Sequence, residues 1–321
     1  MSPNINFFGP FTGNPFQTQT LADESSRTYW EMMMLLLLLA LVPLASALSL
    51  GGIDVTRVRD RAQVDFKDEL FLHNSIDDDA RSLIIFGTYA ADFNNIEYAQ
   101  KLNYYLPRLK EKGLKKVFFI MNADVESCEY LAEKTGLPEE IYLYSDPKGL
   151  LGKSFGVNRG WKSEDSALNP YLKLFGMLFG LGAIQTLPNV ISGYIGNPWK
   201  ADPWIENALA IGQVQKRWPS NALELNDDGN VQVNKFKQLP YVGEWKRRPL
   251  ELATLRLQNM VGLSLLDWEK LKPNDECIKD YGVLTQLGGV RLVDNCLNVL
   301  YEFRDDGICH TADFEQILYK M

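Results

Sequence analysis

Cysteine and histidine, the residue types that most often carry catalytic chemistry, are scarce in this sequence. Its 321 residues include four cysteines and two histidines. The cysteines have neither a CxxC spacing nor the spacing of a zinc site; they are Cys128, Cys277, Cys296 and Cys309. We therefore expect reduced, structural thiols, and we predict no metal ion and no cofactor.

The sequence also has no excess of basic residues. The chain has 33 basic and 41 acidic residues and a net charge of −8. Nucleic-acid binding requires a concentrated Lys/Arg face, so we predict no nucleic-acid partner. One compact basic cluster, residues 245–249, precedes a helix predicted over residues 250–266. We interpret this cluster as a solvated helix entrance, with anionic lipid headgroups as the alternative target.

Residues 32–50 carry no charge at all. Their length is just sufficient for a helix that crosses a bilayer, and the excess of basic residues that follows predicts a single-pass anchor with the C-terminal domain on the cytosolic or stromal side. The alternative is a cleaved signal or plastid-targeting segment, because residues 45–47 read Ala-Ser-Ala, a typical cleavage pattern. In that case residues 1–47 would be absent from the mature protein.

The first 31 residues have turn-forming residues and no helical period, so we expect an extended tail. Exposed aromatic side chains on such a tail are candidates for docking on another protein, with a disordered tail as the alternative. These candidates are Phe7, Phe8, Phe11 and Phe16. Between the anchor and the first strand, residues 51–80 are predicted to be a linker.

The following residues have the period of an α/β unit. Short continuous apolar runs predict buried strands at 83–86, 117–121 and 141–145, and amphipathic patterns predict helices at 96–112 and 124–135. A hairpin over 289–303 and a helix over 311–319, capped by Thr311, would complete the sheet. This order predicts a thioredoxin-like fold formed by residues 81–156 and 286–321, with residues 157–285 as an insertion.

Several separated motifs carry a family resemblance. The run 146–150 (DPKGL) leading to 155–157 (FGV), and the segments 86–100, 193–196, 251–260 and 284–289, resemble the AhpC/TSA, or peroxiredoxin-like, proteins of the thioredoxin superfamily. More specifically, they look like a branch found in cyanobacteria and plastid-bearing organisms. This resemblance implies a photosynthetic context, with a thylakoid membrane as the expected location.

The same resemblance exposes a missing thiol. True peroxiredoxins carry Thr-x-x-Cys at the first helix, whereas here Thr88 is followed by Tyr89, Ala90 and Ala91. Alanine thus stands where the peroxidatic cysteine would be, and we regard Thr88, Ala91 and Asp92 as a degenerate active-site loop. No other side chain in the loop can replace a thiolate in peroxide or disulfide chemistry. Arg291, which could be mistaken for the family's peroxide-binding arginine, is expected to be an exposed strand residue.

A thiol enzyme that uses another cysteine is the rival hypothesis. Cys309 lies beside His310, whose imidazolium would favour the thiolate, and Cys128 on the second helix is the other candidate. No further catalytic residues are predicted.

The insertion contains an unusual uncharged stretch, residues 174–184. It is too short to span a bilayer, but it suits a buried helix, a helix in the bilayer surface, or a re-entrant hairpin that turns at residues 185–189. Phe175, Phe179 and Trp199 are therefore candidate binding residues. A further alternative is a lipid or pigment pocket inside the insertion.

These observations favour a redox-inactive, membrane-anchored scaffold. The resemblance suggests that its partner is a multi-subunit membrane complex such as a photosystem or an antenna.

Overall fold

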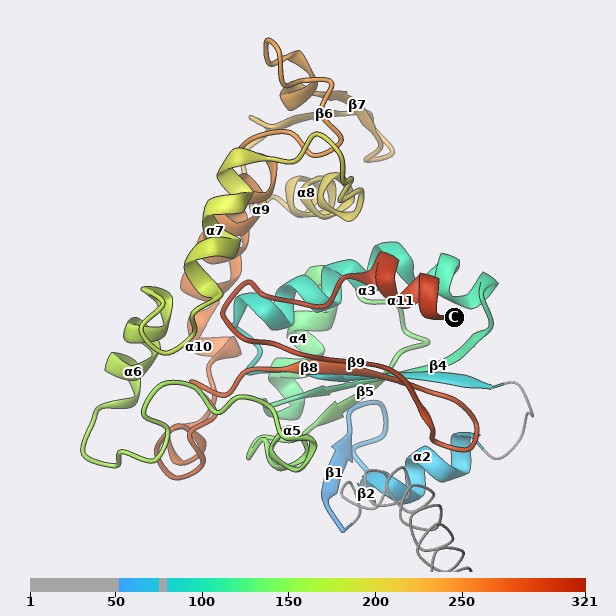
Figure 1. The fold of residues 1–321 in the computed structure, drawn as a ribbon, viewed down its shortest axis with the longest axis vertical. Coiled ribbons are helices and arrows are strands. Elements are labelled where there is room, and N and C mark those ends of the chain that lie inside the picture. Colours follow the sequence, from blue (N-terminus) through green and yellow to red (C-terminus); the bar gives the residue numbers. More distant parts are fainter. Residues whose placement is uncertain (1–51, 75–79) are drawn as a thin grey trace, which may run out of the picture. The chain divides into compact units, whose positions relative to one another are not determined.

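The computed structural model describes residues 52–74 and 80–321, and the main feature of this part is a seven-stranded mixed sheet (Figure 1). The strand order is β2-β1-β5-β4-β3-β8-β9. The strands are β1 (Asp54–Arg57), β2 (Gln63–Asp65), β3 (Arg81–Phe86), β4 (Leu114–Met121), β5 (Tyr142–Ser145), β8 (Gly289–Val293) and β9 (Val299–Arg304). Strands β3, β4 and β5 are parallel, and the others join antiparallel. This mixed α/β architecture fits the predicted thioredoxin-like fold.

Helices cover both faces of the sheet (Figure 1). On one face lie α3 (Phe93–Glu111), α4 (Val125–Thr135) and α11 (Phe314–Lys320), and on the other α2 (Phe66–Asn74) and α5 (Leu150–Phe155). The central strands are apolar throughout because alternate side chains enter different cores. In β3, Leu83 and Ile85 belong to the core under α3, whereas Ile84 and Phe86 belong to the opposite core.

The insertion between α5 and β8 is mainly helical. It contains α6 (Pro170–Leu178), α7 (Thr186–Ile195), α8 (Trp204–Val214), the hairpin β6 (Leu223–Leu225) and β7 (Val231–Asn234), a 3₁₀ turn (Lys235–Gln238), α9 (Glu251–Asn259), a π-type segment (Met260–Leu265), α10 (Trp268–Leu271) and a second π-type segment (Cys277–Tyr281). The helix predicted over 250–266 is thus found as α9 and the π-type segment that continues it.

Two local predictions for the insertion and the last helix are corrected. The uncharged stretch 174–184 is not one helix, because α6 ends at Leu178. Of the residues predicted to turn, 185–189, all but Gln185 already belong to α7. The last helix is capped by Asp313 rather than Thr311, and Asp313 Oδ1 accepts a hydrogen bond of 3.0 Å from the backbone N–H of Glu315. An Asp at this position satisfies a free N–H of the first turn.

Residues 51–80, predicted as a linker, contribute secondary structure to the domain. Strand β1 pairs with β5 at the sheet edge, and α2 packs below it. The Phe66 ring is fully buried in an edge-on arrangement with Phe118 and Tyr144, at centroid distances of 5.9 and 5.7 Å. Arg57 on β1 contacts Glu69 on α2 at 2.6 Å, and the Tyr144 hydroxyl donates to Glu69 at 2.8 Å. The strands are too short and polar to show a clear period in the sequence.

The predicted tail 1–31 and the predicted anchor 32–50 lie outside the described residues. Among the helices that the structure describes, none combines the length and the apolar character needed to cross a membrane.

A substitution in α2 tests whether this segment stabilises the domain. Phe66→Ala should lower the free energy of unfolding by about 3–5 kcal/mol, because it leaves a cavity between Phe118 and Tyr144. Phe71→Ala on the same helix is the matched control, since the Phe71 side chain is 47% exposed and its loss should change stability by about 0.5 kcal/mol or less. Urea denaturation measures both. Equal, small effects would show that α2 is not part of the cooperative unit.

Candidate functional site

The degenerate loop lies where β3 ends and α3 begins, at the carboxyl end of the parallel strands. Thr88, Ala91 and Asp92 are all buried, with at most 4% of any of them exposed. The loop is tied to β4 by backbone hydrogen bonds from Gly87 N to Ile120 O and from Asn122 N to Thr88 O, of 2.7 and 2.9 Å. A side chain at position 91 therefore faces protein rather than solvent.

The insertion covers this loop. Ser264, in the π-type segment after α9, donates a hydrogen bond of 2.6 Å from its hydroxyl to the carbonyl oxygen of Ala91. Trp268 on α10 meets the Tyr89 ring edge-on at a centroid distance of 6.2 Å, and Tyr171 on α6 contacts the same tryptophan at 6.4 Å. Residues from three parts of the insertion thus close the place where a thioredoxin-like protein would admit its substrate.

Two buried carboxyl groups lie behind the loop. Burial raises the pKa of Asp92 to about 6, although the backbone N–H groups of Phe93 and Asn94 oppose the rise. Burial also raises the pKa of Asp305 to about 7. Asp305 accepts hydrogen bonds from the Tyr98 hydroxyl at 2.5 Å and from Asn94 Nδ2 at 2.7 Å. These contacts hold the segment after β9 against α3.

Unpartnered polar atoms surround the loop. Among the described residues, the side-chain atoms Thr88 Oγ1, Asn95 Oδ1 and Nδ2, Asn122 Nδ2 and Gln286 Oε1 are buried and have no hydrogen-bond partner. Gln286 reaches this region from the residues before β8, where its Nε2 donates to Gly149 O at 3.1 Å. Hydroxyl and amide groups can bind a polar group, but none of them is a nucleophile for peroxide or disulfide chemistry.

The two alternative thiols are buried and protonated. Burial raises the pKa of Cys128 far above its usual range and that of Cys309 to about 12. The Cys309 backbone N–H donates to Asn94 Oδ1 at 2.5 Å, and its carbonyl oxygen accepts from Arg256 Nη2 at 3.0 Å, so the residue is held inside the fold.

His310 does not activate Cys309 as the sequence suggested. Its Nδ1 accepts a hydrogen bond from the Asp306 backbone N–H at 3.2 Å, and burial lowers its pKa. A neutral imidazole that already accepts a backbone hydrogen bond gives a thiolate no cationic support. Among the described residues, no group of His, Cys, Asp and Glu side chains is arranged to hold a metal ion.

Two arginines that the sequence placed at the surface are buried instead. Arg291 is 5% exposed, because its guanidinium lies 4.6 Å from the centroid of the Phe155 ring and 2.8 Å from the Glu302 carboxylate. Arg247, from the cluster expected to be solvated, is 7% exposed. Sequence analysis missed the residues around Arg247, because only the fold shows that Glu97 and Lys101 on α3 are buried and line the same cavity.

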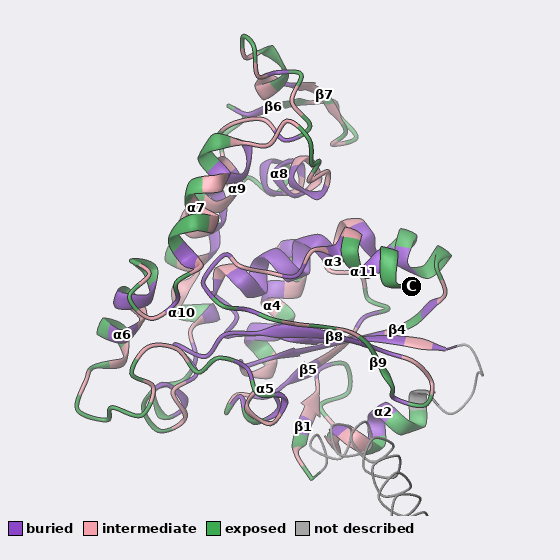
Figure 2. Cartoon of the chain, in the orientation of Figure 1, coloured by how far each residue is buried: buried purple, intermediate pink, exposed green. Residues whose placement is uncertain are grey.

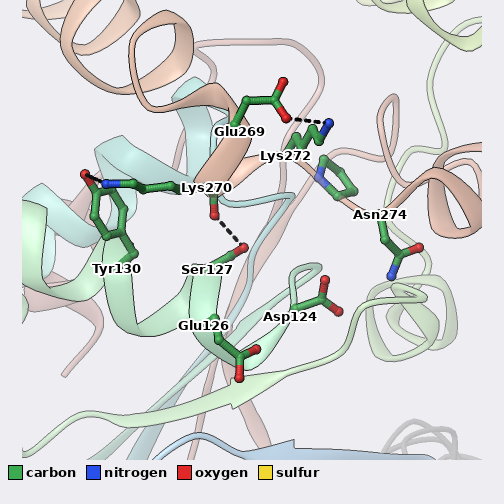
Figure 3. A pocket seen from close by; sticks show the side chains of 9 residues that line it. Asp124, Glu126, Ser127, Tyr130, Glu269, Lys270, Lys272 and Asn274 are labelled. Carbon is green, nitrogen blue, oxygen red and sulfur yellow. Dashed lines mark hydrogen bonds and ion pairs between the residues drawn. The ribbon is translucent and has the colours of Figure 1, made fainter.

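A further cavity of about 450 Å³ lies between α4 and α10 (Figure 3). Its charged side chains include Asp124, Glu126 and Glu269. The Lys270 ammonium lies 4.5 Å from the centroid of the Tyr130 ring, and Lys272 pairs with Glu269 at 2.8 Å. Since both lysines already have partners, the lining offers no free positive group for a ligand.

The predicted binding residues Phe175, Phe179 and Trp199 lie at the surface, with 57%, 56% and 82% exposure. Phe7, Phe8, Phe11 and Phe16 lie outside the described residues. The structure therefore separates two regions: a closed loop without a nucleophile, and an exposed apolar surface on the insertion.

Thiol reactivity tests the state of the cysteines. We expect one fast-reacting thiol per folded chain with Ellman's reagent, from Cys296, the exposed one, because the other three are buried. Cys296→Ser should remove the fast phase, whereas the matched change Cys309→Ser should leave it intact. A fast phase that disappears in Cys309→Ser would contradict the buried, protonated state of that thiol.

The pKa of Asp305 predicts a pH dependence of stability. Because its pKa is higher in the folded than in the unfolded chain, the folded state binds the proton more tightly, and this contribution is lost as the pH rises through 7. Between pH 6 and pH 8 the wild type should lose about 1 kcal/mol relative to Asp305→Asn. Urea denaturation at each pH measures this difference. Asp228→Asn, at an exposed turn, is the control, and a pH-independent difference for Asp305→Asn would refute the assignment.

Comparison with known proteins agrees with the thioredoxin-like fold. A family model described as AhpC/TSA antioxidant enzyme matches residues 101–307, from the middle of α3 to just beyond β9. The matched range begins after the loop of Thr88 and Ala91, so the match does not depend on the missing thiol. No curated protein sequence matches the chain. The match covers more than half of the chain, and the protein therefore belongs to the AhpC/TSA family.

Proposed function

We propose that this protein is a redox-inactive member of its family that acts as a membrane-anchored accessory or scaffold protein. Its partner is a multi-subunit membrane complex, and the resemblance to the photosynthetic branch suggests a photosystem or antenna in a thylakoid membrane. The observation that carries the proposal is an exposed apolar surface on α6 and α7. We call it the α6–α7 surface, and it comprises Leu172, Phe175, Phe179, Leu181, Ile184, Ile191, Ile195 and Trp199.

The apolar side chains of the α6–α7 surface are widely exposed. Leu181 and Ile184 are 69% and 78% exposed, and the rings of Phe175 and Phe179 lie 4.7 Å apart. The sequence between residues 174 and 199 contains no charged residue. In Figure 2, α6 and α7 show exposed stretches mixed with buried and intermediate ones, in contrast to the mostly buried central strands of the sheet. Exposed apolar side chains gathered in one stretch of the chain are typical of contact sites for proteins or membranes.

The closed loop supports a role in binding rather than catalysis. A peroxidase requires a thiolate that a peroxide can reach, whereas Ala91 has no thiol and lies under Ser264. The alternative, an oxidoreductase that uses Cys309 or Cys128, would need a thiol with a lowered pKa, and burial raises the pKa of both. A lipid or pigment carrier would need an apolar cavity, but the side chains of the α6–α7 surface are exposed.

The chain length between the predicted anchor and the domain supports a membrane-embedded partner. The predicted span ends at residue 50, and β1 begins at Asp54. If residues 32–50 cross the bilayer, the domain starts within a few residues of the headgroups. A domain tethered this closely would remain near the protein complexes of the same membrane.

The test replaces part of the α6–α7 surface. The triple variant Phe175→Ser, Phe179→Ser and Ile184→Ser should remain in the membrane fraction through its anchor but lose co-purification with the large complexes after mild detergent extraction. Stability should change little, because these side chains are exposed. Tyr241→Ser, at a fully exposed aromatic residue outside this surface, is the control and should still co-purify. Wild-type protein that migrates alone at 36.5 kDa would contradict the proposal.

N-terminal sequencing of the isolated protein tests the anchor separately. A mature chain that begins after residue 47 would show that residues 1–47 are a cleaved signal rather than an anchor. The proposed role of the α6–α7 surface would still be tested by the co-purification experiment.

A further inference from the structure

A polar cavity of about 270 Å³ lies where the insertion meets α3. Three parts of the chain line it: one face of α3, the segment 309–314 before and at the start of α11, and residues of the insertion from α7 to α9. This cavity is separate from the closed loop and from the α6–α7 surface. Seven of its sixteen lining residues are charged, which is unusual for a junction between parts of one fold.

Lys101 on α3 brings a buried positive charge to the cavity. The residue is 8% exposed, and its ammonium lies 5.3 Å from the centroid of the Trp204 ring. Its Nζ donates to Thr311 Oγ1 at 2.6 Å and to the carbonyl oxygen of Ala312 at 2.9 Å. Both acceptors are neutral, so the ammonium makes no direct hydrogen bond to a carboxylate.

Arg247 brings a second buried cation from the insertion. Backbone hydrogen bonds with Asn197, of 2.7 and 2.8 Å, fix its position, and its Nη2 donates to Ser192 O at 2.9 Å. Its Nε lies 3.5 Å from Asp202 Oδ2 but has no hydrogen-bond partner among the described residues. A buried guanidinium N–H without an acceptor is costly unless a ligand or water completes it.

The remaining charges of the lining pair with one another. Arg256 contacts Glu97 at 2.7 Å, and Lys200 contacts Asp313 at 2.5 Å. Asp202 is then the only carboxylate of the lining left for Lys101 and Arg247 together. The cavity consequently has one more positive than negative group, at a site where solvent screening is weak.

We propose that this cavity binds a small oxyanion, a carboxylate or phosphate group, between Lys101 and Arg247. Such a group supplies the missing negative charge and accepts the free N–H of Arg247 and the third N–H of Lys101. Charge-assisted hydrogen bonds of this kind are the strong ones in protein interiors. Since the lining comes from both the thioredoxin-like domain and the insertion, the bound oxyanion stabilises the junction between them.

Calorimetric titration of the purified full chain tests this proposal, with acetate, inorganic phosphate and a short-chain phosphatidylglycerol as probes at constant ionic strength. We expect saturable binding of at least one probe. Arg247→Gln and Lys101→Met should each weaken it by about tenfold or more. Arg61→Gln is the matched control, because Arg61 is exposed, pairs with Glu126 at 2.8 Å and does not line this cavity.

The three probes identify the source of the oxyanion. Acetate alone would indicate a carboxylate ligand, inorganic phosphate a free phosphate, and binding only of the lipid a headgroup. If a variant fails to fold, an NMR titration of the wild type still tests the proposal. The indole N–H signal of Trp204, which lines the cavity, should shift, and that of Trp268, which does not line it, should stay unchanged. No saturable binding, or binding that Arg247→Gln and Lys101→Met leave unchanged, would overturn the proposal.

Discussion

The hydrogen bond from Ser264 to the carbonyl oxygen of Ala91 is the constraint on which the closed state of the loop depends. In a thioredoxin-like fold, the turn between the first buried strand and its helix is normally the place where the chain presents its chemistry to solvent. Here the insertion lies over that turn, and Trp268 packs against Tyr89 beside it. The turn has become part of the core, and its polar side chains are sequestered instead of being offered to a substrate. The missing thiol and the closed loop therefore support, independently of each other, the proposal that this loop is redox-inactive. The first observation concerns the sequence of the loop, and the second concerns its packing.

Covering the loop gives the insertion two different faces. Its inner side carries Arg247 and Arg256, which meet Glu97 and Lys101 on α3 across a polar cavity. Its outer side, on α6 and α7, is apolar and exposed. An apolar inner side would have been the simpler way to hold an insertion on a domain, since buried ion pairs gain little net stability over hydrophobic contacts. Charged groups at this junction instead make the stability of the junction dependent on the groups that neutralise them.

Much of the sheet could be predicted from the sequence, because β3, β4 and β5 are continuous apolar runs whose neighbours at both faces are helices. The prediction was wrong for charged residues with distant partners. Arg291 reads locally as an exposed strand residue, and only the fold brings the Phe155 ring against it. Likewise, Lys246 and Arg247 are adjacent in one basic run, yet the first is exposed and the second is buried. The apolar patterns of β1 and α2 were too short to predict these elements. Their place in the domain depends on long-range contacts of Phe66 with Phe118 and Tyr144. Local pattern thus predicts the elements, and long-range contacts decide which polar residues form sites.

The absence of a thiol at position 91 is not by itself sufficient to explain the lack of a redox centre. Reactivity requires a thiolate, and a thiol ionises at neutral pH only where a positive charge or solvent supports it. Burial raises the pKa of Cys309 to about 12, although Arg256 nearby partly opposes the rise. A cysteine placed at Ala91 would lie under Ser264 next to Asp92, a buried acid with a raised pKa, and would have no cation in the loop to stabilise its charge. Placing a cysteine at position 91 without moving the insertion would therefore add a thiol but not a nucleophile, because the loop would stay covered by the insertion and would contain no cation.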